Sequence, residues 1–507
     1  MTETHMLTII GLGPGEIDQL TIEALSVLEA ADTVYLRTER HPAVPALRKR
    51  FPSLEIRSFD AVYESQPTFE DVYAAIVAEL MDHLRARDVV YCVPGSPVVD
   101  ETTVELLRKL ADVERVPIRL IHGLSYLEPV MACVEGASRS WTTVVDAIEI
   151  DLITSEDALG AIPGRPGRLA KRGVVPTAPL LVSQVYDAHI AASLKLWLSA
   201  SWPEEHEVSV ITAAGTRSQS VERIPIHRLD RVEFDHLTSV YVPPIDPIED
   251  VRTFTGLLNV TQTLRAPGGC PWDREQTHDT LKPHLLEETY EVIEALDEHD
   301  YEKLCGELGD LLFQVTIHSQ VAAEAGEFDI SDVIAGITRK LIRRHPHVFA
   351  DVSLTTSSAV LERWESMKQE ETPDRPSVLS TIPLATPALP YSYAVQKRAA
   401  NQGFEWPDIE SVLGKVDEEL GELRDAVGNG ERRGRVGEEL GDLLFTLVSV
   451  GRWLKVEPEE TLRRANRKFV QRFQYIEKAC KENGKVLRKL SAEELDTLWD
   501  EAKAQAT

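Results

Sequence analysis

The stretch Glu438-Glu-Leu-Gly-Asp-Leu-Leu-Phe445 decides the fold of the C-terminal half, because it repeats an earlier stretch, Gly306-Glu-Leu-Gly-Asp-Leu-Leu-Phe313. Two further pairs of similar blocks lie around it in the same order. They are Leu286-Glu-Glu-Thr-Tyr-Glu291 with Asp417-Glu-Glu-Leu-Gly-Glu422, and Arg339-Lys-Leu-Ile-Arg-Arg344 with Arg467-Lys-Phe-Val-Gln-Arg472. Three blocks in one order, with helical periodicity throughout residues 253–507, indicate that one all-helical domain is duplicated.

Each copy carries two pairs of acidic residues at a spacing of three. The pairs are Glu288 with Glu291 and Glu307 with Asp310 in the first copy, and Glu419 with Glu422 and Glu439 with Asp442 in the second. Residues three apart share a helix face, and the apolar stripe beside them predicts two packed helices with carboxylates between them. Clustered carboxylates repel one another, and a divalent cation relieves that repulsion. All-oxygen ligands without cysteine predict Mg²⁺ or Mn²⁺.

Each copy also places two cations one helical turn apart, Lys340 with Arg344 and Lys468 with Arg472. Such cations suit the phosphates of a metal-bound nucleotide, so the residues indicate phosphoryl chemistry. The alternative is that the acidic pairs are solvated helix faces, the usual meaning of one such run in an acidic protein. Their recurrence in one sequence context argues against it. A di-iron bundle is excluded because no histidine follows these glutamates at the third position.

Together with Gly268-Gly-Cys-Pro-Trp-Asp273 and Arg343-Arg-His-Pro-His-Val-Phe349, the acidic motifs resemble the MazG family over residues 253–507. The resemblance implies an all-α nucleoside triphosphate pyrophosphohydrolase, a Mg²⁺ cofactor and a homodimer. It implies that the eight acidic residues hold metal, and that those of the second copy are catalytic together with Lys468 and Arg472. It also implies nucleotide contacts from Lys415, Arg435, Lys468, Arg472 and Trp499. The alternative for Trp499 is ordinary helix packing.

The two copies differ at positions that the resemblance assigns to phosphate binding. His284 stands where the second copy has Lys415, and Thr338 stands where it has Asn466. We therefore expect the second copy to be the main catalytic domain, and the first to bind metal and act mainly as a structural partner. Lys397 and Arg398 are further candidates near the nucleotide, with a surface helix start as the alternative.

Residues 1 to about 245 alternate apolar runs with helical periodicity, which predicts an α/β domain with a mostly parallel sheet. We expect strands at 7–13, 33–37, 88–93 and 117–121, and a second lobe after Trp141 with strands at 180–185, 207–211 and 240–242. Three loops follow strands: Gly11-Leu-Gly-Pro-Gly15, Val93-Pro-Gly-Ser-Pro97 and His122-Gly-Leu-Ser-Tyr126. Open α/β sheets bind ligands at this edge, although structural tight turns are the alternative.

The stretch Ile9-Ile-Gly-Leu-Gly-Pro-Gly-Glu16, with these loops, resembles the tetrapyrrole methylase family over residues 5–245. The resemblance implies S-adenosylmethionine between two lobes and a tetrapyrrole or another methyl acceptor. The implied cofactor-binding residues are Pro14, Gly95, Ser96, Pro97, Ser125 and Tyr126. The Gly-Ser-Pro at 95–97 departs from the Gly-Asp-Pro of many members and lacks their acidic residue. The domain order resembles the YabN-like fusions.

The 507 residues thus divide into a methylase-like domain at 1–245 and two MazG-like helical domains at 246–376 and 377–507, with proline-rich segments at both boundaries. The chain has 83 acidic against 54 basic residues and a net charge of −29, which excludes a nucleic-acid backbone as partner. Five scattered cysteines, no signal peptide and no long apolar segment indicate a cytoplasmic protein without membrane contact.

We expect an enzyme that hydrolyses nucleoside triphosphates to clean the nucleotide pool, with methyl transfer as a second activity of the N-terminal domain. An alternative is that the N-terminal domain binds S-adenosylmethionine as a regulatory module without transferring a methyl group. Another alternative is a structural helical scaffold.

Overall fold

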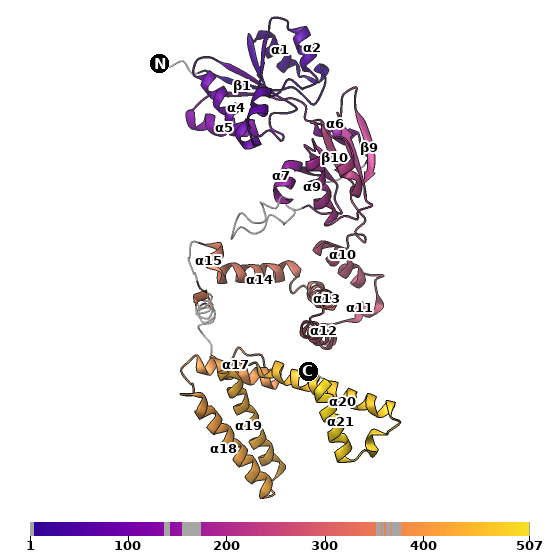
Figure 1. The fold of residues 1–507 in the computed structure, drawn as a ribbon. Helices are drawn as coiled ribbons and strands as arrows, with labels where there is room; N and C mark the ends of the chain where they lie inside the picture. Colours follow the sequence, from indigo (N-terminus) through magenta and orange to yellow (C-terminus); the bar gives the residue numbers. More distant parts are fainter. Residues whose placement is uncertain are drawn as a thin grey trace. The chain divides into compact units, whose positions relative to one another are not determined.

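The computed structural model describes residues 5–135, 142–154, 174–350 and 377–505, with Thr356, Ala359, Val360, Arg363 and Met367 between the last two ranges. The chain divides into two compact units, Met1–Val352 and Ser353–Thr507 (Figure 1). Trp141, after which the sequence predicts the second lobe, lies outside the described residues. So do residues 372–376, where the linker between the two helical copies is predicted to begin.

The first unit begins with a parallel five-stranded sheet of order β3-β2-β4-β1-β5. The strands are β1 (Leu7–Gly11), β2 (Thr33–Leu36), β3 (Glu55–Ser58), β4 (Val89–Val93) and β5 (Ile118–Ile121). Alternate residues of β1 face opposite sides of the sheet. Leu7 and Ile9 contribute to the core with α4 (Phe69–Leu84) and α5 (Thr102–Glu114). Ile10 contributes to the core with α1 (Ile22–Ala30) and α2 (Val44–Arg50).

This arrangement confirms the mostly parallel sheet that the alternating pattern predicted. A parallel sheet with helices on both faces is buried on both sides, which is why its strands are nearly continuous apolar runs. The β1 strand lies between β4 and β5, so the three loops that follow these strands emerge side by side. The short helix α3 (Asp60–Ser65) belongs to this lobe, whereas Val130 of α6 (Leu127–Ala132) packs against Leu181, Ile211 and Tyr241 of the second lobe.

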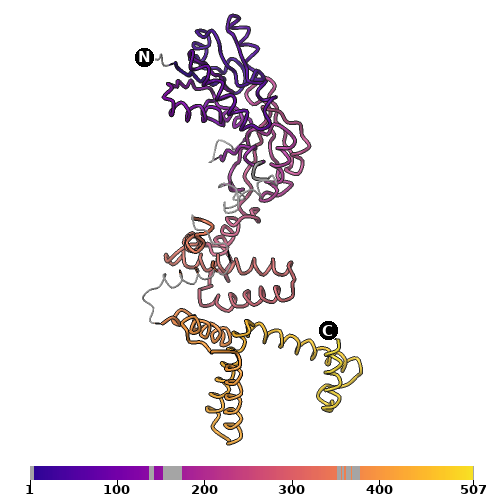
Figure 2. The backbone as a smooth tube through the Cα atoms, turned by 60° about the vertical axis from the view of Figure 1, so that its left-hand side comes forward, coloured from indigo at the N-terminus to yellow at the C-terminus, as the bar shows by residue number. Residues whose placement is uncertain are grey.

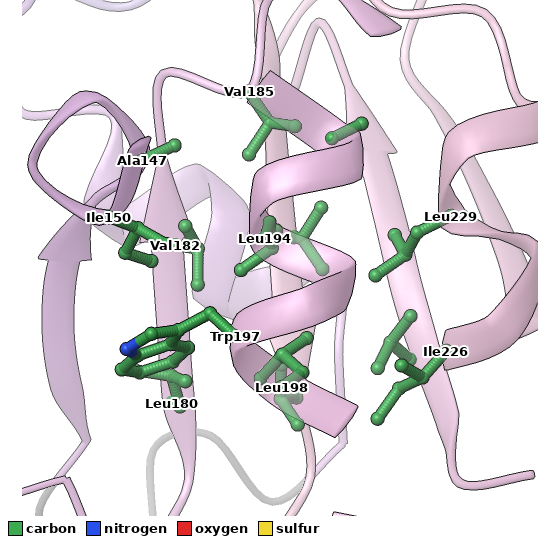
Figure 3. Packing of buried hydrophobic residues seen from close by; sticks show 14 of the residues in the cluster. Ala147, Ile150, Leu180, Val182, Val185, Leu194, Trp197, Leu198, Ile226 and Leu229 are labelled. Atoms are coloured by element: carbon green, nitrogen blue, oxygen red, sulfur yellow. The ribbon is translucent and has the colours of Figure 1, made fainter. Parts of the chain in front are cut away.

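The second lobe is a mixed sheet of order β6-β7-β10-β8-β9. Its strands are β6 (Thr143–Asp146), β7 (Leu180–Ser183), β8 (Glu207–Thr212), β9 (Ser220–Pro225) and β10 (Thr238–Val242). Its helices are α7 (Ala147–Thr154) and α9 (Ala188–Ser199). Figure 3 shows Leu194, Trp197 and Leu198 of α9 lying against the strands. The strands at 180, 207 and 240 confirm the expected second lobe, whereas β6 and β9 were not predicted.

The rest of the first unit is helical within the described residues. It consists of α10 (Phe254–Arg265), α11 (Pro271–Glu275), α12 (His278–Glu298), α13 (Tyr301–Ala325), α14 (Ile330–Arg344) and α15 (Pro346–Phe349). A capping box of Thr277 and Thr280 begins α12, and Gly326 ends α13 at a φ of 75°. The helices α12 and α13 pack along each other as a hairpin (Figure 2).

The second unit repeats this pattern. Its helices are α17 (Ala388–Ala400), α18 (Ile409–Gly428), α19 (Arg433–Trp453), α20 (Pro458–Glu482) and α21 (Ala492–Gln505). The helices α18 and α19 form a hairpin, and α20 and α21 pack together to one side of it (Figures 1 and 2). The predicted order of an α/β half and an all-α half is confirmed. Along the described residues, no helix combines the length and apolar composition that crossing a bilayer requires.

Candidate functional site

The hairpin of the second unit brings the predicted acidic residues together. Glu419 and Glu422 lie on α18, and Glu439 and Asp442 lie on α19. One carboxylate oxygen from each of Glu419, Glu439 and Asp442 lies within 4.8 Å of the others. Glu422 lies against Glu439. Only 6% of Glu419 and 1% of Glu439 is exposed. A solvated helix face does not bury its carboxylates, so this alternative does not describe Glu419 and Glu439, whereas Glu422 and Asp442 are exposed.

Burial is the largest influence on Glu439, and it raises the pKa of this carboxyl. The neighbouring charges of Glu422 and Asp442 raise it further, and the guanidinium of Arg435 opposes the shift. Neither carboxylate oxygen of Glu439 receives a well-directed hydrogen bond, although Arg435 forms an ion pair with one of them. A buried carboxylate with unsatisfied oxygens beside further carboxylates is an arrangement that a divalent cation fits.

Two of the four cations expected to contact phosphates, Lys415 and Arg435, lie against these carboxylates. The Nζ of Lys415 lies 2.7 Å from Glu418 and 2.8 Å from Glu419, and these hydrogen bonds raise the pKa of Lys415. Arg435 pairs with Glu439 and lies 3.5 Å from Glu438. Both cations therefore act as internal counter-ions of the acidic cluster, a role that the sequence did not indicate.

The first copy builds the same acidic cluster with fewer cations. Oxygens of Glu288, Glu291 and Glu307 lie within 4.8 Å of one another. Partial burial, followed by the charges of neighbouring carboxylates including Asp310, raises the pKa values of Glu288 and Glu307.

The cations near the first cluster have other partners. His284, at the position of Lys415, lies 3.5 Å from Glu287. Lys303 forms ion pairs with Glu294 at 2.5 Å and with Glu298 at 3.4 Å. Neither side chain forms an ion pair with the cluster among the described contacts, although the charge of Lys303 opposes the rise in the pKa of Glu307.

The remaining predicted nucleotide contacts lie on α20 and α21. The guanidinium of Arg472 lies 5.5 Å from the ring centre of Trp499, and Phe469 lies 5.4 Å from the same ring. Trp499 therefore takes part in helix packing, the alternative interpretation, and forms a cation–π pair as well. Among the described residues, Lys468 and Arg472 form no ion pair with the carboxylates of the second copy. Arg398 donates to the carbonyl of Val378 at 3.0 Å and contacts Thr381, whereas Lys397 is exposed.

The glycine loops of the first unit meet at the carboxyl edge of the parallel sheet. The backbones of Gly13 and Gly95 exchange two hydrogen bonds, of 3.1 and 2.8 Å. A cavity of about 610 Å³ opens beside them, between the two lobes. Three of the six residues that the family resemblance assigns to the cofactor line it, namely Pro14, Gly95 and Tyr126. Ser96, Pro97 and Ser125 are buried and are not among its lining residues. Ser125 instead accepts a hydrogen bond from the backbone of Leu127 at 3.0 Å.

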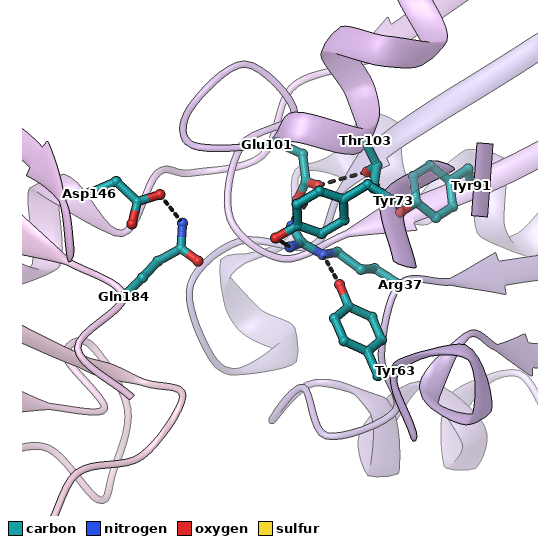
Figure 4. A network of polar contacts seen from close by, with 8 residues as sticks. All are labelled: Arg37, Tyr63, Tyr73, Tyr91, Glu101, Thr103, Asp146 and Gln184. Atoms are coloured by element: carbon teal, nitrogen blue, oxygen red, sulfur yellow. Dashed lines mark hydrogen bonds and ion pairs between the residues drawn. The ribbon is translucent and has the colours of Figure 1, made fainter. Parts of the chain in front are cut away.

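A buried arginine network in this cavity was missed by the sequence analysis (Figure 4). Arg37 donates to Glu101 at 2.5 Å and to the hydroxyl of Tyr63 at 2.8 Å. Thr103 donates to Glu101 at 2.8 Å and lies 3.0 Å from the hydroxyl of Tyr91. Arg37 could have been identified as a candidate from the sequence, because it is a charged residue at the carboxyl end of a predicted parallel strand, where such sheets bind ligands.

The second lobe supplies polar groups to the opposite side (Figure 4). Gln184 donates to Asp146 at 2.8 Å, and burial raises the pKa of Asp146 to about 6. Asp100 accepts hydrogen bonds from Tyr126 and, at 3.0 Å, from Ser183.

Three lining residues that are not glycine, Asp100, Gln184 and Ala213, have left-handed backbones with φ of 52°, 58° and 51°. Such strained positions cluster at binding and catalytic sites, because surrounding contacts must hold them in place. Tertiary contacts set these left-handed backbone conformations, so no local sequence pattern predicted them.

Comparison with known proteins assigns families to both halves. The model of the MazG nucleotide pyrophosphohydrolase domain matches residues 276–349 and 408–476. The model of the tetrapyrrole (corrin/porphyrin) methylases matches residues 6–230. The uncharacterized protein YabN of Bacillus subtilis is 40% identical over 500 residues, which cover 98% of each chain.

Two further relatives match the C-terminal half. The nucleoside triphosphate pyrophosphohydrolase/pyrophosphatase MazG of Thermotoga maritima is 45% identical over 251 residues, which are 49% of this chain and 95% of that protein. The nucleoside triphosphate pyrophosphohydrolase of Escherichia coli K12 is 44% identical over 256 residues, 49% of this chain and 96% of that protein.

Proposed function

The chain belongs to the family that joins a tetrapyrrole methylase domain to MazG nucleotide pyrophosphohydrolase domains, and from this we propose that its second helical copy hydrolyses nucleoside triphosphates. The products are a nucleoside monophosphate and pyrophosphate. One observation carries the proposal: a buried carboxylate, Glu439, lies among three others, and its oxygens receive no well-directed hydrogen bond but only the ion pair with Arg435. We assign to this activity the removal of unusual or surplus nucleotides from the pool.

Glu419, Glu422, Glu439 and Asp442 would hold Mg²⁺ or Mn²⁺ in this proposal. The metal, when bound, supplies activation of water and compensation of negative charge at the phosphates. Lys415 and Arg435 neutralise the carboxylates in its absence and turn to the nucleotide phosphates when metal and substrate enter. The two cations are then positioned at the site before the nucleotide arrives, which limits the side-chain ordering that binding requires.

We assign the other parts of the chain as follows. Residues 246–376 form a first MazG domain that binds metal through Glu288, Glu291, Glu307 and Asp310 and serves mainly as a structural partner. Residues 377–507 form the catalytic domain. Residues 1–245 bind S-adenosylmethionine at the edge formed by Pro14, Gly95 and Tyr126 and transfer its methyl group. The strained backbone at that cavity supports a ligand-binding site there.

A homodimer is part of the proposal, and the apolar surface of the second unit supports it. Large apolar side chains on α19 and α20 are between 38% and 57% exposed, namely Leu440, Leu444, Phe445, Phe469 and Phe473. A soluble monomer rarely exposes so many apolar residues together. A second copy that covers them would also place the partner's helices near the acidic cluster, where phosphate-binding cations are needed.

The first test is pyrophosphate release by the full-length protein. With Mg²⁺ and a panel of ribo- and deoxyribonucleoside triphosphates, including modified bases, we expect equal amounts of monophosphate and pyrophosphate, measured by chromatography and a coupled pyrophosphate assay. Chelation of the metal abolishes the reaction. Release of orthophosphate and a nucleoside diphosphate, or no product from folded protein, would contradict the proposal.

The counter-ion role of Lys415 predicts opposite effects on metal and nucleotide binding. The Lys415→Met variant is expected to bind Mn²⁺ alone about fivefold more tightly, because an ion pair that competes with the metal is lost. With Mn²⁺ present it binds an α,β-methylene nucleoside triphosphate about tenfold more weakly, because a charged phosphate contact is lost. Calorimetry measures both affinities, and Lys478→Met on α20 is the control. Parallel changes in both affinities would contradict the role.

A further inference from the structure

The cavity between the two lobes has an aromatic wall. The ring of Phe69 lies 6.3 Å from Tyr63, 6.1 Å from Tyr73 and 5.8 Å from Tyr186, measured between ring centres. All four side chains line the cavity, and Tyr186 follows a strand of the second lobe whereas the other three belong to the first. Aromatic faces of this kind bind flat apolar groups and attract cations through the negative potential of the ring.

The charged groups around this wall are mostly acidic. Four carboxylates line the cavity, those of Asp60, Asp100, Glu101 and Asp235, against the two guanidinium groups of Arg37 and Arg40. Burial lowers the pKa of His41 to about 4, so its imidazole is neutral at pH 7. The lining therefore carries an excess of negative charge.

The buried Arg37 is not available to receive a carboxylate ligand, because it is already paired. Arg37 is held by Glu101 at 2.5 Å and by the hydroxyl of Tyr63 at 2.8 Å. Arg40 is exposed and lies 3.9 Å from Glu64. Asp60 and Asp100, by contrast, are fixed as acceptors: Thr38 donates to Asp60 at 2.6 Å and Ser183 donates to Asp100 at 3.0 Å.

The volume limits the size of a second ligand. Pockets of about 300–1,000 Å³ enclose one drug-sized molecule. The cofactor alone is such a molecule, so a cavity of about 610 Å³ encloses the cofactor with a compact acceptor beside it. S-adenosylmethionine carries one net positive charge, which compensates part of the acidic excess and leaves a site for one more cation.

We propose that the part of this cavity beside the cofactor binds a compact aromatic cation, such as an arylalkylamine, and rejects the polycarboxylate tetrapyrroles after which the family is named. The proposal rests on the proposed cofactor site, because the cofactor occupies the edge at Pro14 and Gly95. The aromatic wall receives the ring, and Asp100 receives the ammonium group. A tetrapyrrole would bring several carboxylates to a lining that already carries four, and the buried arginine of that lining is held by Glu101. An uncompensated charge of this kind is a strong barrier to binding.

Calorimetry on the full-length protein tests this with three probes in the presence of sinefungin, a cationic and unreactive analogue of the cofactor. The probes are tryptamine, its carboxylate counterpart indole-3-propionate, and uroporphyrin III. We expect tryptamine to bind at least about tenfold more tightly than indole-3-propionate, and uroporphyrin III not to bind. Tighter binding of uroporphyrin III, or equal binding of the two indoles, overturns the proposal.

Variants separate the contributions of charge and fold. Asp100→Asn is expected to weaken tryptamine binding about tenfold and to leave indole-3-propionate nearly unchanged, because the ammonium partner is lost. Asp82→Asn on α4, the same chemical change outside the cavity lining, serves as the control. Glu101→Gln releases Arg37 and shifts the preference toward the carboxylate probe. Unchanged tryptamine affinity in Asp100→Asn contradicts the inference. Loss of sinefungin binding with retained tryptamine binding contradicts the cofactor assignment instead.

Discussion

The Glu439→Gln variant is expected to hydrolyse nucleoside triphosphates about 10²–10³-fold more slowly than the unmodified protein, the range found when one stabilising group of a preorganised site is removed. Glutamine keeps the shape of the side chain but offers only one weak oxygen ligand, so the cluster loses a negative charge where the metal is expected to bind. The variant should stay folded. Burial raises the pKa of Glu439, which means that the ionised carboxylate is already disfavoured at this position, and a neutral glutamine is therefore tolerated. Steady-state pyrophosphate release and a melting curve measure the two properties.

The control is Glu307→Gln, the equivalent change in the first copy. Glu307 occupies the position of Glu439 in the repeated block and lies in the equivalent cluster. If the second copy is the main catalytic domain, this control retains most of the hydrolysis and loses only metal binding at its own cluster. Full activity in Glu439→Gln together with inactivity in Glu307→Gln would reverse the assignment of the two copies.

The acidic clusters were predictable because their geometry is mostly local. A spacing of three residues fixes two carboxylates on one helix face, and the apolar residues on the same helix select the face that packs. Only the pairing of two helices is long-range, and a short connection between neighbouring helices makes an antiparallel hairpin the natural outcome. The duplication gave the same prediction twice from independent residues.

The positions of the cations were less predictable. Lys415 lies four residues before Glu419, and Arg435 lies four before Glu439, so their ion pairs with these carboxylates are ordinary contacts along one helix. The family resemblance pointed instead to contacts with nucleotide phosphates. Both roles are compatible if the cations exchange one anionic partner for another.

The lining of the N-terminal cavity was largely beyond sequence reasoning. Arg37 and Glu101 are 64 positions apart and Asp100 and Ser183 are 83 apart, so only the folded lobes bring them together. Their residue types are common in loops, and no spacing marks them. The glycine loops were predictable, because a glycine-rich loop that follows a strand is a local sequence pattern. Only the contacts of these loops with one another are long-range.

The tight contact between these loops predicts a large effect for Gly123→Ala. A Cβ at Gly123 would lie 2.2 Å from the carbonyl oxygen of Gly95 and 2.7 Å from the carbonyl carbon of Gly11. All of these neighbours are backbone atoms that hydrogen bonds and strand pairing hold in place, so no flexible side chain can give way. We expect the N-terminal domain to lose about 3 kcal/mol of stability, the upper end for overpacking. Its melting temperature then falls by about 6–12 °C, and cofactor binding is lost.

Gly95→Ala is the matched control, because it adds the same methyl group to the same set of loops. Gly95 has a φ of 62°, which costs an alanine about 1–2 kcal/mol, yet its added Cβ has no neighbour closer than 4.0 Å. This variant should therefore be the more stable of the two, while its methyl group enters the cavity and weakens S-adenosylmethionine binding.

Thermal unfolding followed by calorimetric titration with the cofactor separates the two effects. Hydrolysis of nucleoside triphosphates serves as an internal reference, because the second unit contains the proposed catalytic residues. If Gly123→Ala melts at or above the temperature of Gly95→Ala, the close backbone contact of the three loops is not what shapes this site.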